Sequence, residues 1–519
     1  MTTKLSIDWL TSEGDPPISP GNIVAFTQIG EVVDQCLTEA RSASTEARAT
    51  TVADRLRYIR HFRENLARNA AEVARQLCAA VQRSPGEFLT SEIIPLLDAC
   101  RFLERNAVRL LKRRSHGSWT MPLWLAGTRH EIHREPLGVV LIIGPSNYPF
   151  FLPGVQLLQA LTAGNAVLFK PAPSGVNCAE SLYGLLRAAG LPQNLLQLLP
   201  PTPDAAIHAL GRKIDKVFLT GSAETGLKVL VHAATTITPS VVELSGCDGA
   251  LILPDADLHL AARSIAFGLT LNSGRTCIAP RRAFVWPQIA EAFTAKLRRA
   301  LADRPKLLLK SQPHVDLVGS ISEAVESGAR MINGSIDTSG TVEGPLVLAN
   351  VPQESSFAIA ENWGPILCVI EVANEAEAVA AFHRSPFRLG ASVFTQDSAA
   401  ARRLARSLQV GSVCVNDLIV PTADGRLPFG GRKQSGFGVT RGPEGLLEMT
   451  ALKVISTRRS GQRLHLNTPV PNQFEQVSAY TTLAYGTMTD RWRTMKQLVA
   501  RSFKRIAIQR PVLPPKESI

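Results

Sequence analysis

The chain has 519 residues and a mass of 56.1 kDa, and 45% of its residues are hydrophobic, 19% charged and 6% aromatic. This composition excludes an intrinsically disordered chain and a small disulfide scaffold, and the length exceeds the roughly 250–300 residues that one hydrophobic core can serve. At least two folded parts are therefore expected.

The eight cysteines are spread thinly, with no CxxC pair and no Cys/His spacing that closes a zinc site. We therefore expect no bound metal and a reducing compartment. Asp8 interrupts the first ten residues where a signal core would have to lie, and no stretch approaches the roughly 18 apolar residues of a spanning helix. The sequence predicts a cytoplasmic protein.

The net charge of +12 and the isoelectric point of about 9.5 would suit a nucleic acid, an anionic membrane or an acidic substrate. However, nine basic residues stand against three acidic ones between Ser460 and Ile519, so that half of the excess lies at the carboxyl end. No zinc-finger spacing or RNP-type aromatic string accompanies it. We therefore expect no nucleic-acid partner.

Residues 51–111 carry apolar side chains three or four positions apart, at Leu56, Ile59, Phe62 and Leu66. This spacing predicts amphipathic helices.

From residue 137 onward, short β-branched runs end in glycine or proline turns and are followed by helical stretches, which is typical of buried parallel strands. The first series of runs is 137–144, 165–171, 215–222, 240–246 and 249–254. The second series is 281–287, 365–372, 390–396 and 411–417, interleaved with helical segments at 375–383 and 398–408. The sequence therefore predicts two α/β domains.

Two motifs suggest covalent chemistry. In NSGRTC, residues 272–277, Cys277 follows a glycine-containing turn, and a thiolate placed there can attack a carbonyl carbon, although a lone cysteine is more often a buried hydrophobe. In VVELSG, Glu243 ends an apolar strand at the edge where open parallel sheets place their sites, and burial would raise its pKa toward that of a useful base. The simpler alternative is a strand-end glutamate paired with a surface cation.

Other strand ends and loops carry polar residues. In GPSNYP, Asn147 can direct its amide at an oxyanion, a role worth roughly 3–4 kcal/mol, or is an ordinary turn asparagine. Lys170 ends the next strand, where an ammonium can bind ribose hydroxyls or a phosphate. Residues 220–226, TGSAETG, open a helix whose free N–H groups can receive a pyrophosphate, or form a simple N-cap. The loops at 361–365 and 427–438 are rich in glycine.

In order and spacing, these motifs resemble the aldehyde dehydrogenase superfamily over about residues 51–456. The resemblance implies that Cys277 is the nucleophile, that Glu243 is the general base, and that Asn147 forms the oxyanion hole with the backbone N–H of Cys277. It also implies NAD or NADP as the cofactor. The residues implied to bind it are Lys170, Gly221, Ser222, Gly226, Leu244, Glu361 and Trp363, the last in place of the usual phenylalanine.

The implied reaction oxidises an aldehyde to the carboxylic acid through a thiohemiacetal and a thioester on the cysteine, which a glutamate-activated water hydrolyses. The implied fold is α/β, with a Rossmann-like parallel-sheet cofactor domain, an α/β catalytic domain and a small bridging element that joins subunits into a homodimer or homotetramer. The expected boundaries are 1–119 and 136–242 for the helical start and cofactor domain, 243–438 for the catalytic domain, and 120–135 and 439–475 for the bridging element.

Two other functions on the same fold stay open. A CoA-acylating, reductive enzyme generally lacks the base, so Glu243 argues against it. An inactive scaffold would need a broken site, whereas Cys277, Glu243 and Asn147 are all present.

Three departures from the family's pattern surround the expected centre. Arg275 replaces a glutamine two residues before the nucleophile and faces either the site or, as we favour, the surface as an ion-pair residue. Ser245 replaces a glycine and adds a side chain where the family's glutamate swings, and Ser146 replaces a tryptophan. For the substrate pocket, proximity to the motifs nominates Tyr148, Phe151 and Ile278.

A further departure concerns the choice of cofactor. Pro173 stands where many NAD-preferring members carry a glutamate that repels a 2′-phosphate. NADP is therefore admissible, and Ser174, Arg212 or Lys213 are expected to meet the phosphate.

Residues 476–519 form an extension beyond the family's expected end. If helical, this segment is a basic amphipathic helix that Pro511 ends. The helix either docks on the body or a partner subunit, or makes the protein peripheral to a membrane. Its expected apolar stripe consists of Trp492, Met495, Val499, Phe503 and Ile506.

Overall fold

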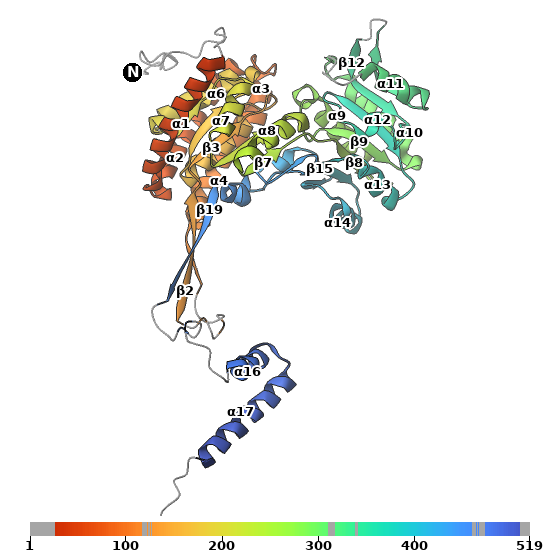
Figure 1. Ribbon diagram of the computed structural model, residues 1–519. Coiled ribbons are helices and arrows are strands. Elements are labelled where there is room, and N and C mark those ends of the chain that lie inside the picture. The colour runs from red at the N-terminus through yellow and green to blue at the C-terminus, as the bar shows by residue number, and fades with distance from the viewer. Residues whose placement is uncertain are drawn as a thin grey trace, which may run out of the picture. The chain divides into compact units, whose positions relative to one another are not determined.

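The computed structural model describes residues 26–116, 122, 125, 127–309, 317–337, 341–458, 463, 466 and 473–508, with side chains described from residue 28 to residue 500. Its contacts divide the chain into two compact units, Met1–Arg114 with Ile132–Ile455, and Ser115–Glu131 with Ser456–Ile519. Both α/β sheets lie in the first unit (Figure 1).

The amino-terminal part of the first unit is helical, as the apolar spacing predicts. Its elements are α1 (Phe26–Arg48), α2 (Val52–Leu77), α3 (Pro85–Phe88) and α4 (Ile94–Leu111), with a π-helical turn at Leu89–Ile93. At the start of α2, Thr51 Oγ1 accepts the N–H of Asp54 at 3.1 Å and the Asp54 carboxylate accepts the N–H of Thr51, which forms a capping box. The predicted apolar positions of α2 are all buried.

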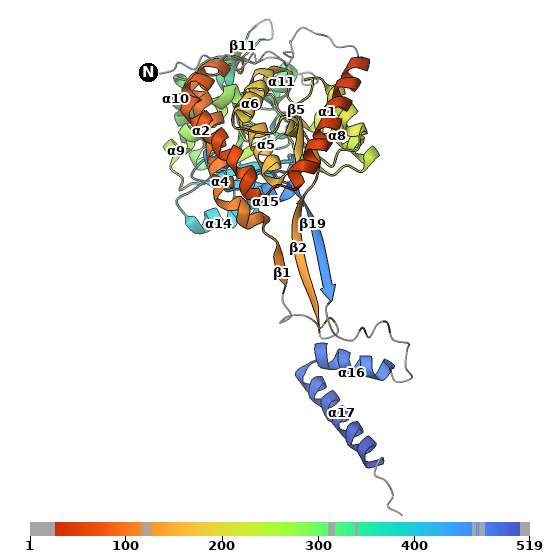
Figure 2. The same cartoon turned by 90° about the vertical axis from the view of Figure 1, so that its left-hand side faces the viewer.

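The first sheet has six strands in the order β18-β7-β6-β3-β4-β5, parallel except for β18. Its strands are β3 (Val139–Ile143), β4 (Ala166–Lys170), β5 (Leu196–Leu198), β6 (Lys216–Thr220), β7 (Ser240–Glu243) and β18 (Gly436–Phe437). The intervening helices are α5 (Phe151–Ala163), α6 (Val176–Ala188), α7 (Pro203–Gly211) and α8 (Ala223–Thr236). All residues of β3, β4 and β6 are buried, because α2, α4, α5 and α6 pack together beside this sheet (Figure 2).

The second sheet has eight strands, in the order β10-β12-β13-β9-β8-β15-β16 with β11 beside β12. They are β8 (Asp248–Ile252), β9 (Pro280–Val285), β10 (Leu307–Leu309), β11 (Arg330–Ile336), β12 (Val342–Ala349), β13 (Ile366–Glu371), β15 (Gly390–Phe394) and β16 (Ser412–Val415). Helices α9 (Leu258–Thr270), α10 (Pro287–Ala302), α11 (Leu317–Glu326), α12 (Ser356–Ile359), α13 (Glu375–Phe382) and α14 (Ser398–Ser407) complete this part. The predicted α/β fold class is confirmed, whereas the antiparallel strands β10 and β11 were not anticipated.

The remaining elements link or follow the two domains. A short antiparallel pair joins β14 (Phe387–Arg388) to β17 (Arg432–Lys433), and a three-stranded sheet has the order β1 (Arg114–His116), β2 (Thr128–Pro136), β19 (Thr450–Arg458). Within the expected bridging range 439–475, α15 (Gly442–Glu448) precedes β19, and Leu446 and Met449 are buried in the core of the first sheet.

Helices α16 (Gln473–Tyr485) and α17 (Met488–Ile508) pack against each other in the second unit. Helix α17 lies within the expected extension 476–519, whereas α16 begins inside the expected bridging range. The side chains of Phe503 and Ile506 lie outside the described residues. Within the described part of the chain, no helix combines the length and apolarity that crossing a membrane requires.

Candidate active site

The carboxyl ends of four parallel strands bring the predicted polar residues to one edge of the first sheet. Ile143 of β3 is paired with Lys170 of β4, and Thr220 of β6 with Glu243 of β7. Glu243 is held from both sides, because Gly436 of β18 pairs with it in antiparallel register. The turns after β3 and β6 therefore bring Asn147, Gly221 and Ser222 to the edge where Glu243 lies, the arrangement expected of an open α/β sheet. Lys170 ends β4, on the far side of β3 from β7.

The turn before Cys277 has an unusual backbone. Asn272, Ser273 and Gly274 all have left-handed φ angles, of +52°, +55° and +74°. A Cβ on Gly274 would lie 2.7 Å from the Cα of Pro365, so only glycine lets this turn pack against the 361–365 loop. The turn before Cys277 and the 361–365 loop are thus in direct contact.

A buried ion pair supports the loop of Asn147. Arg83 lies 2.9 Å from Glu92, donates through Nε to Asn272 Oδ1 at 2.8 Å, and donates to the backbone oxygen of Asn147. The other carboxylate oxygen of Glu92 accepts the N–H of Phe151 at 2.6 Å. Sequence reasoning missed this pair, because Arg83 lies in the connection between α2 and α3 and Glu92 in the π-helical turn, both far from the motifs.

Asn147 lies beside the nucleophile turn rather than facing solvent. Its Nδ2 donates to the backbone oxygen of Arg275 at 3.2 Å, and its Oδ1 accepts the N–H of Tyr148 at 2.9 Å. The Tyr148 hydroxyl is 2.6 Å from Thr276 Oγ1. These bonds hold the Asn147 side-chain amide against the turn that precedes Cys277.

Cys277 and Glu243 face each other. The Sγ of half-buried Cys277 lies 4.0 Å from Oε1 of Glu243, which is buried. Burial raises the pKa of Glu243 to about 7, while the Arg441 guanidinium and the Thr440 hydroxyl act in the opposite direction. Burial also raises the pKa of the Cys277 thiol, and the nearby carboxylates of Glu243 and Asp248 add to that increase. In the resting site the sulfur is therefore protonated and the base titrates near neutrality.

Two cavities meet at this pair, and among the described residues Cys277 and Glu243 alone line both. The first cavity has a volume of about 530 Å³ and the second about 580 Å³, each within the usual range for small-molecule sites. A thiol and a base at the junction of two cavities can act on two different molecules at once.

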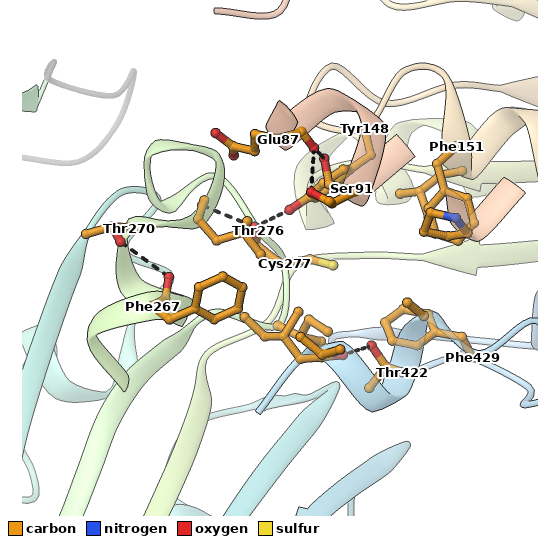
Figure 3. Close-up of a pocket in the computed structure, with 18 of the residues that line it drawn as sticks. Glu87, Ser91, Tyr148, Phe151, Phe267, Thr270, Thr276, Cys277, Thr422 and Phe429 are labelled. Carbon is orange, nitrogen blue, oxygen red and sulfur yellow. Dashed lines mark hydrogen bonds between the residues drawn. The ribbon is translucent and has the colours of Figure 1, made fainter. Parts of the chain in front are cut away.

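The aromatic cavity, as we call the first one, has mainly apolar walls. Figure 3 shows Cys277 with Tyr148 and Phe151 on one side and Phe267, Thr422 and Phe429 on the other. The three nominated residues, Tyr148, Phe151 and Ile278, all line it. The sequence motifs did not point to five further apolar wall residues, which are Leu152, Phe267, Leu271, Ile419 and Val420.

The polar cavity, as we call the second one, is lined by most of the predicted cofactor residues. These are Gly221, Ser222, Leu244, Glu361 and Trp363, together with Ser146, Asn147 and Ser245. Ser222 caps α8, its Oγ accepting the N–H of Thr225 at 3.2 Å, so that the first turn of this helix faces the cavity. Burial raises the pKa of Glu361, and a hydrogen bond from Ser245 lowers it.

Two predicted cofactor residues do not line the polar cavity. Lys170 is buried at the end of β4, where burial lowers its pKa. Gly226 instead makes room for Leu244, because a Cβ there would lie 2.6 Å from a Leu244 methyl group. Gly226 thus acts through Leu244, which does line the cavity.

Arg212, one of the residues expected to meet a 2′-phosphate, does not line the polar cavity. Its Nε and Nη2 donate to the two carboxylate oxygens of Asp34 on α1, both at 2.8 Å, and its contact with a phosphate stays a prediction. Arg275 lines neither cavity, and its Nε donates to the backbone oxygen of Asn272 at 3.4 Å. Its guanidinium is thus held at its own turn, and the favoured surface ion pair stays a prediction.

The described part of the chain gathers no group of three or more His, Cys, Asp or Glu side chains that could hold a metal ion.

A family model described as the aldehyde dehydrogenase family matches residues 21–455. The chain belongs to the aldehyde dehydrogenase family. At the level of the family, this makes it an oxidoreductase that acts on aldehydes.

Individual proteins agree with the family match. The 4,4′-diapolycopene aldehyde oxidase of Methylomonas sp is 33% identical over 435 residues, which cover 81% of this chain and 80% of that protein. The NADP-dependent glyceraldehyde-3-phosphate dehydrogenase of Bacillus halodurans C-125, solved with NADP, superposes with a TM-score of 0.76 at 28% identity, covering 83% of this chain and 91% of that one. A Mycobacterium tuberculosis aldehyde dehydrogenase solved with NAD+ gives 0.74 at 25% identity, over 82% and 90% of the two chains.

Proposed function

We propose that the chain oxidises apolar aldehydes to carboxylic acids with NAD+ or NADP+, with Cys277 as nucleophile, Glu243 as general base and Asn147 as oxyanion donor. The observation that carries the proposal is that an aromatic and a polar cavity meet at Cys277 and Glu243. The aldehyde enters the first cavity and the dinucleotide the second.

The proposed chemistry begins with the proton of Cys277. Because the thiol pKa is raised, Glu243 at 4.0 Å takes this proton as Sγ bonds to the aldehyde carbon. The oxyanion of the thiohemiacetal is stabilised by the N–H of Cys277 and by the amide of Asn147, which must turn from the backbone oxygen of Arg275. The dinucleotide, when bound, supplies a hydride acceptor.

The second half of the reaction removes the acyl group. Glu243, with a pKa of about 7, first releases the proton of Cys277 to solvent. As a carboxylate it then takes a proton from a water molecule, and the resulting hydroxide attacks the thioester carbon. The carbon–sulfur bond breaks, the acid leaves, and Glu243 returns its proton to the departing sulfur, which regenerates the Cys277 thiol. Release to water rather than to CoA follows from the presence of this base.

The polar cavity fits a dinucleotide. The open first turn of α8 offers backbone N–H groups to a pyrophosphate, and the Glu361 carboxylate can accept hydrogen bonds from ribose hydroxyls. Pro173 places no carboxylate near the adenosine ribose, so we propose that NADP is tolerated. Lys170, at the end of β4, is the cation proposed to lie near the bound nucleotide.

The walls of the aromatic cavity suggest the substrate class. The cavity that leads to the sulfur is lined by Phe151, Phe267, Ile419 and Phe429. Each apolar side chain that contacts a ligand favours a hydrocarbon group over water. The Methylomonas relative is named for an aldehyde of diapolycopene, which agrees with a large apolar substrate.

A substrate panel tests the proposed function. Short, long-chain and aromatic aldehydes would be assayed with NAD+ and with NADP+, in the presence and absence of CoA. We expect the free acid as product, independent of CoA, and a higher kcat/KM for long-chain than for two-carbon aldehydes. Acyl-CoA as the product, or no turnover with any aldehyde, would contradict the proposal.

We further propose a cytoplasmic homodimer or homotetramer. All eight cysteines are free thiols, which suits a reducing compartment. Strand β19 lies at the edge of its sheet and exposes Leu452 and Val454, which favours pairing with a second copy. Light scattering of wild type against L452D/V454D tests this: we expect dissociation of the variant.

We propose that α17 attaches the protein to an anionic membrane surface. Trp492, Met495 and Val499 recur on one face and are 50–57% exposed, and Arg491 and Lys496 flank this face. Flotation with anionic vesicles is expected for the full chain and not for a chain ending at Gln473. Equal flotation of both would contradict membrane attachment and favour docking on a subunit.

A further inference from the structure

Arg441 follows the 427–438 loop and is fixed by its backbone. It has a left-handed φ of +63°, its N–H donates to Gln159 Oε1 at 3.3 Å, and its carbonyl accepts the N–H of Gly445 at 2.9 Å. Only 4% of the residue is exposed. Arg441 thus has an unfavourable backbone conformation, and this conformation places a charged side chain in the protein interior.

The guanidinium of Arg441 lies between aromatic rings in the wall of the aromatic cavity. Its Cζ is 4.2 Å from the ring centre of Phe429 and 5.5 Å from that of Phe151, and Nη1 donates to the backbone oxygen of Thr422 at 2.6 Å. Its Nε is buried and has no hydrogen-bond partner among the described residues. Stacking and one strong hydrogen bond therefore hold the group without neutralising its charge.

Glu243 is the candidate counter-charge for Arg441. Both residues line the aromatic cavity, and Oε2 of Glu243 is likewise buried without a hydrogen-bond partner in the part of the chain that the structure describes. No ion pair links Arg441 to an acidic residue there, so two buried opposite charges each lack a full complement of partners. Opposite charges in such a setting stabilise each other more strongly than at a surface.

Other charged groups near Glu243 do not replace Arg441. Glu361 shares the polar cavity with Glu243 and Asp248 lies near Cys277, and both are acidic. Arg304 also lines the aromatic cavity, but it belongs equally to a separate depression between α9 and α10 and exerts no resolved effect on Glu243.

We infer that Arg441 is a positioning residue for aldehyde oxidation, the buried counter-ion that keeps the Glu243 carboxylate ionised at neutral pH so that it can activate water. The inference rests on the proposed role of Glu243. Without the cation, burial would act unopposed by a charge and the pKa of Glu243 would rise further above its ordinary value. Arginine suits the role, because its own charge persists in a buried site.

The test follows hydrolysis of the acyl-enzyme, in which Cys277 no longer titrates. A p-nitrophenyl alkanoate acylates the enzyme, and loss of the acyl group is followed by intact mass from pH 5.5 to 9.5. For wild type we expect the rate to rise with a midpoint near pH 7. For R441M and R441Q the midpoint should move up by at least one pH unit, with a loss of at least about fivefold at pH 7 that is recovered near pH 9.

Controls separate charge from packing. R441K keeps the charge and should restore the midpoint to within about half a unit, and R426M, at an exposed arginine paired with Asp424, should match wild type. Folded R441M and R441Q with wild-type midpoints would overturn the inference, as would an R441K midpoint displaced as far as theirs. If E243Q hydrolyses its acyl group at the wild-type rate, the proposed role of Glu243 has failed instead.

Discussion

The polar and aromatic cavities share Cys277 and Glu243 but are built in different ways. The polar cavity is formed by turns that directly follow strands of the first sheet, and much of its wall is backbone and small residues. The aromatic cavity takes side chains from the α3 region, α5, α9 and the loops around 419–429 and 441. The position of the polar cavity is thus set mainly by the sheet topology, whereas the aromatic cavity depends on side chains that converge from distant segments.

Removing the shared sulfur has the largest expected effect. C277A should lower aldehyde oxidation by at least about 10³-fold, because no other described residue lining both cavities is a nucleophile. The walls of the polar cavity should remain, so dinucleotide affinity measured by calorimetry should change less than about threefold. Oxidation within tenfold of wild type would place the nucleophile elsewhere.

Removing the oxyanion donor should come next. N147A is expected to lower kcat by about 10²–10³-fold with little change in KM, since the amide acts on charge that develops only in the transition state. Steady-state kinetics with one long-chain aldehyde measures this. A variant with raised KM and unchanged kcat would assign Asn147 to binding rather than to catalysis.

Truncating the aromatic cavity should affect long substrates selectively. F151A is expected to lower kcat/KM for a long-chain aldehyde by about 10-fold or more, and for a two-carbon aldehyde by less than threefold, because only the longer chain reaches the lost ring. The matched control F474A, at an 83% exposed phenylalanine on α16, should change neither value. Equal losses for both aldehydes in F151A would indicate general disruption.

A charge beside the polar cavity should produce the smallest change. P173E should shift the ratio of kcat/KM for NADP+ over NAD+ toward NAD+ by about three- to tenfold, because a carboxylate repels the 2′-phosphate. P173Q controls for loss of the proline ring. A wild-type preference for NAD+ above tenfold would already contradict NADP tolerance.

The two cavities also differ in how far the sequence predicts them. The helices of 51–111 and most of the parallel strands of both sheets follow from apolar spacing, whereas β5, β10, β11, β12 and β18 were not predicted. The residues at strand ends, such as Glu243 and Gly221, follow from the rule that parallel strands end at one edge. Phe267 and Arg441 could not be found in this way, because their importance depends on which distant segments pack together. Arg83 is similar: a helical sequence gives no sign that its guanidinium will meet Asn147 and Asn272.

The thioester on Cys277 can be observed directly. E243Q would be incubated with a long-chain aldehyde and NADP+ until NADPH formation levels off, and then analysed by intact mass and peptide mapping. Because E243Q also lacks the group that accepts the proton of Cys277, we expect slow formation of one acyl group per chain on Cys277, together with one NADPH per chain. This acyl group should persist far longer than in wild type. NADPH formation without an acyl group on Cys277, or an acyl group on another residue, would contradict covalent catalysis at the junction of the two cavities.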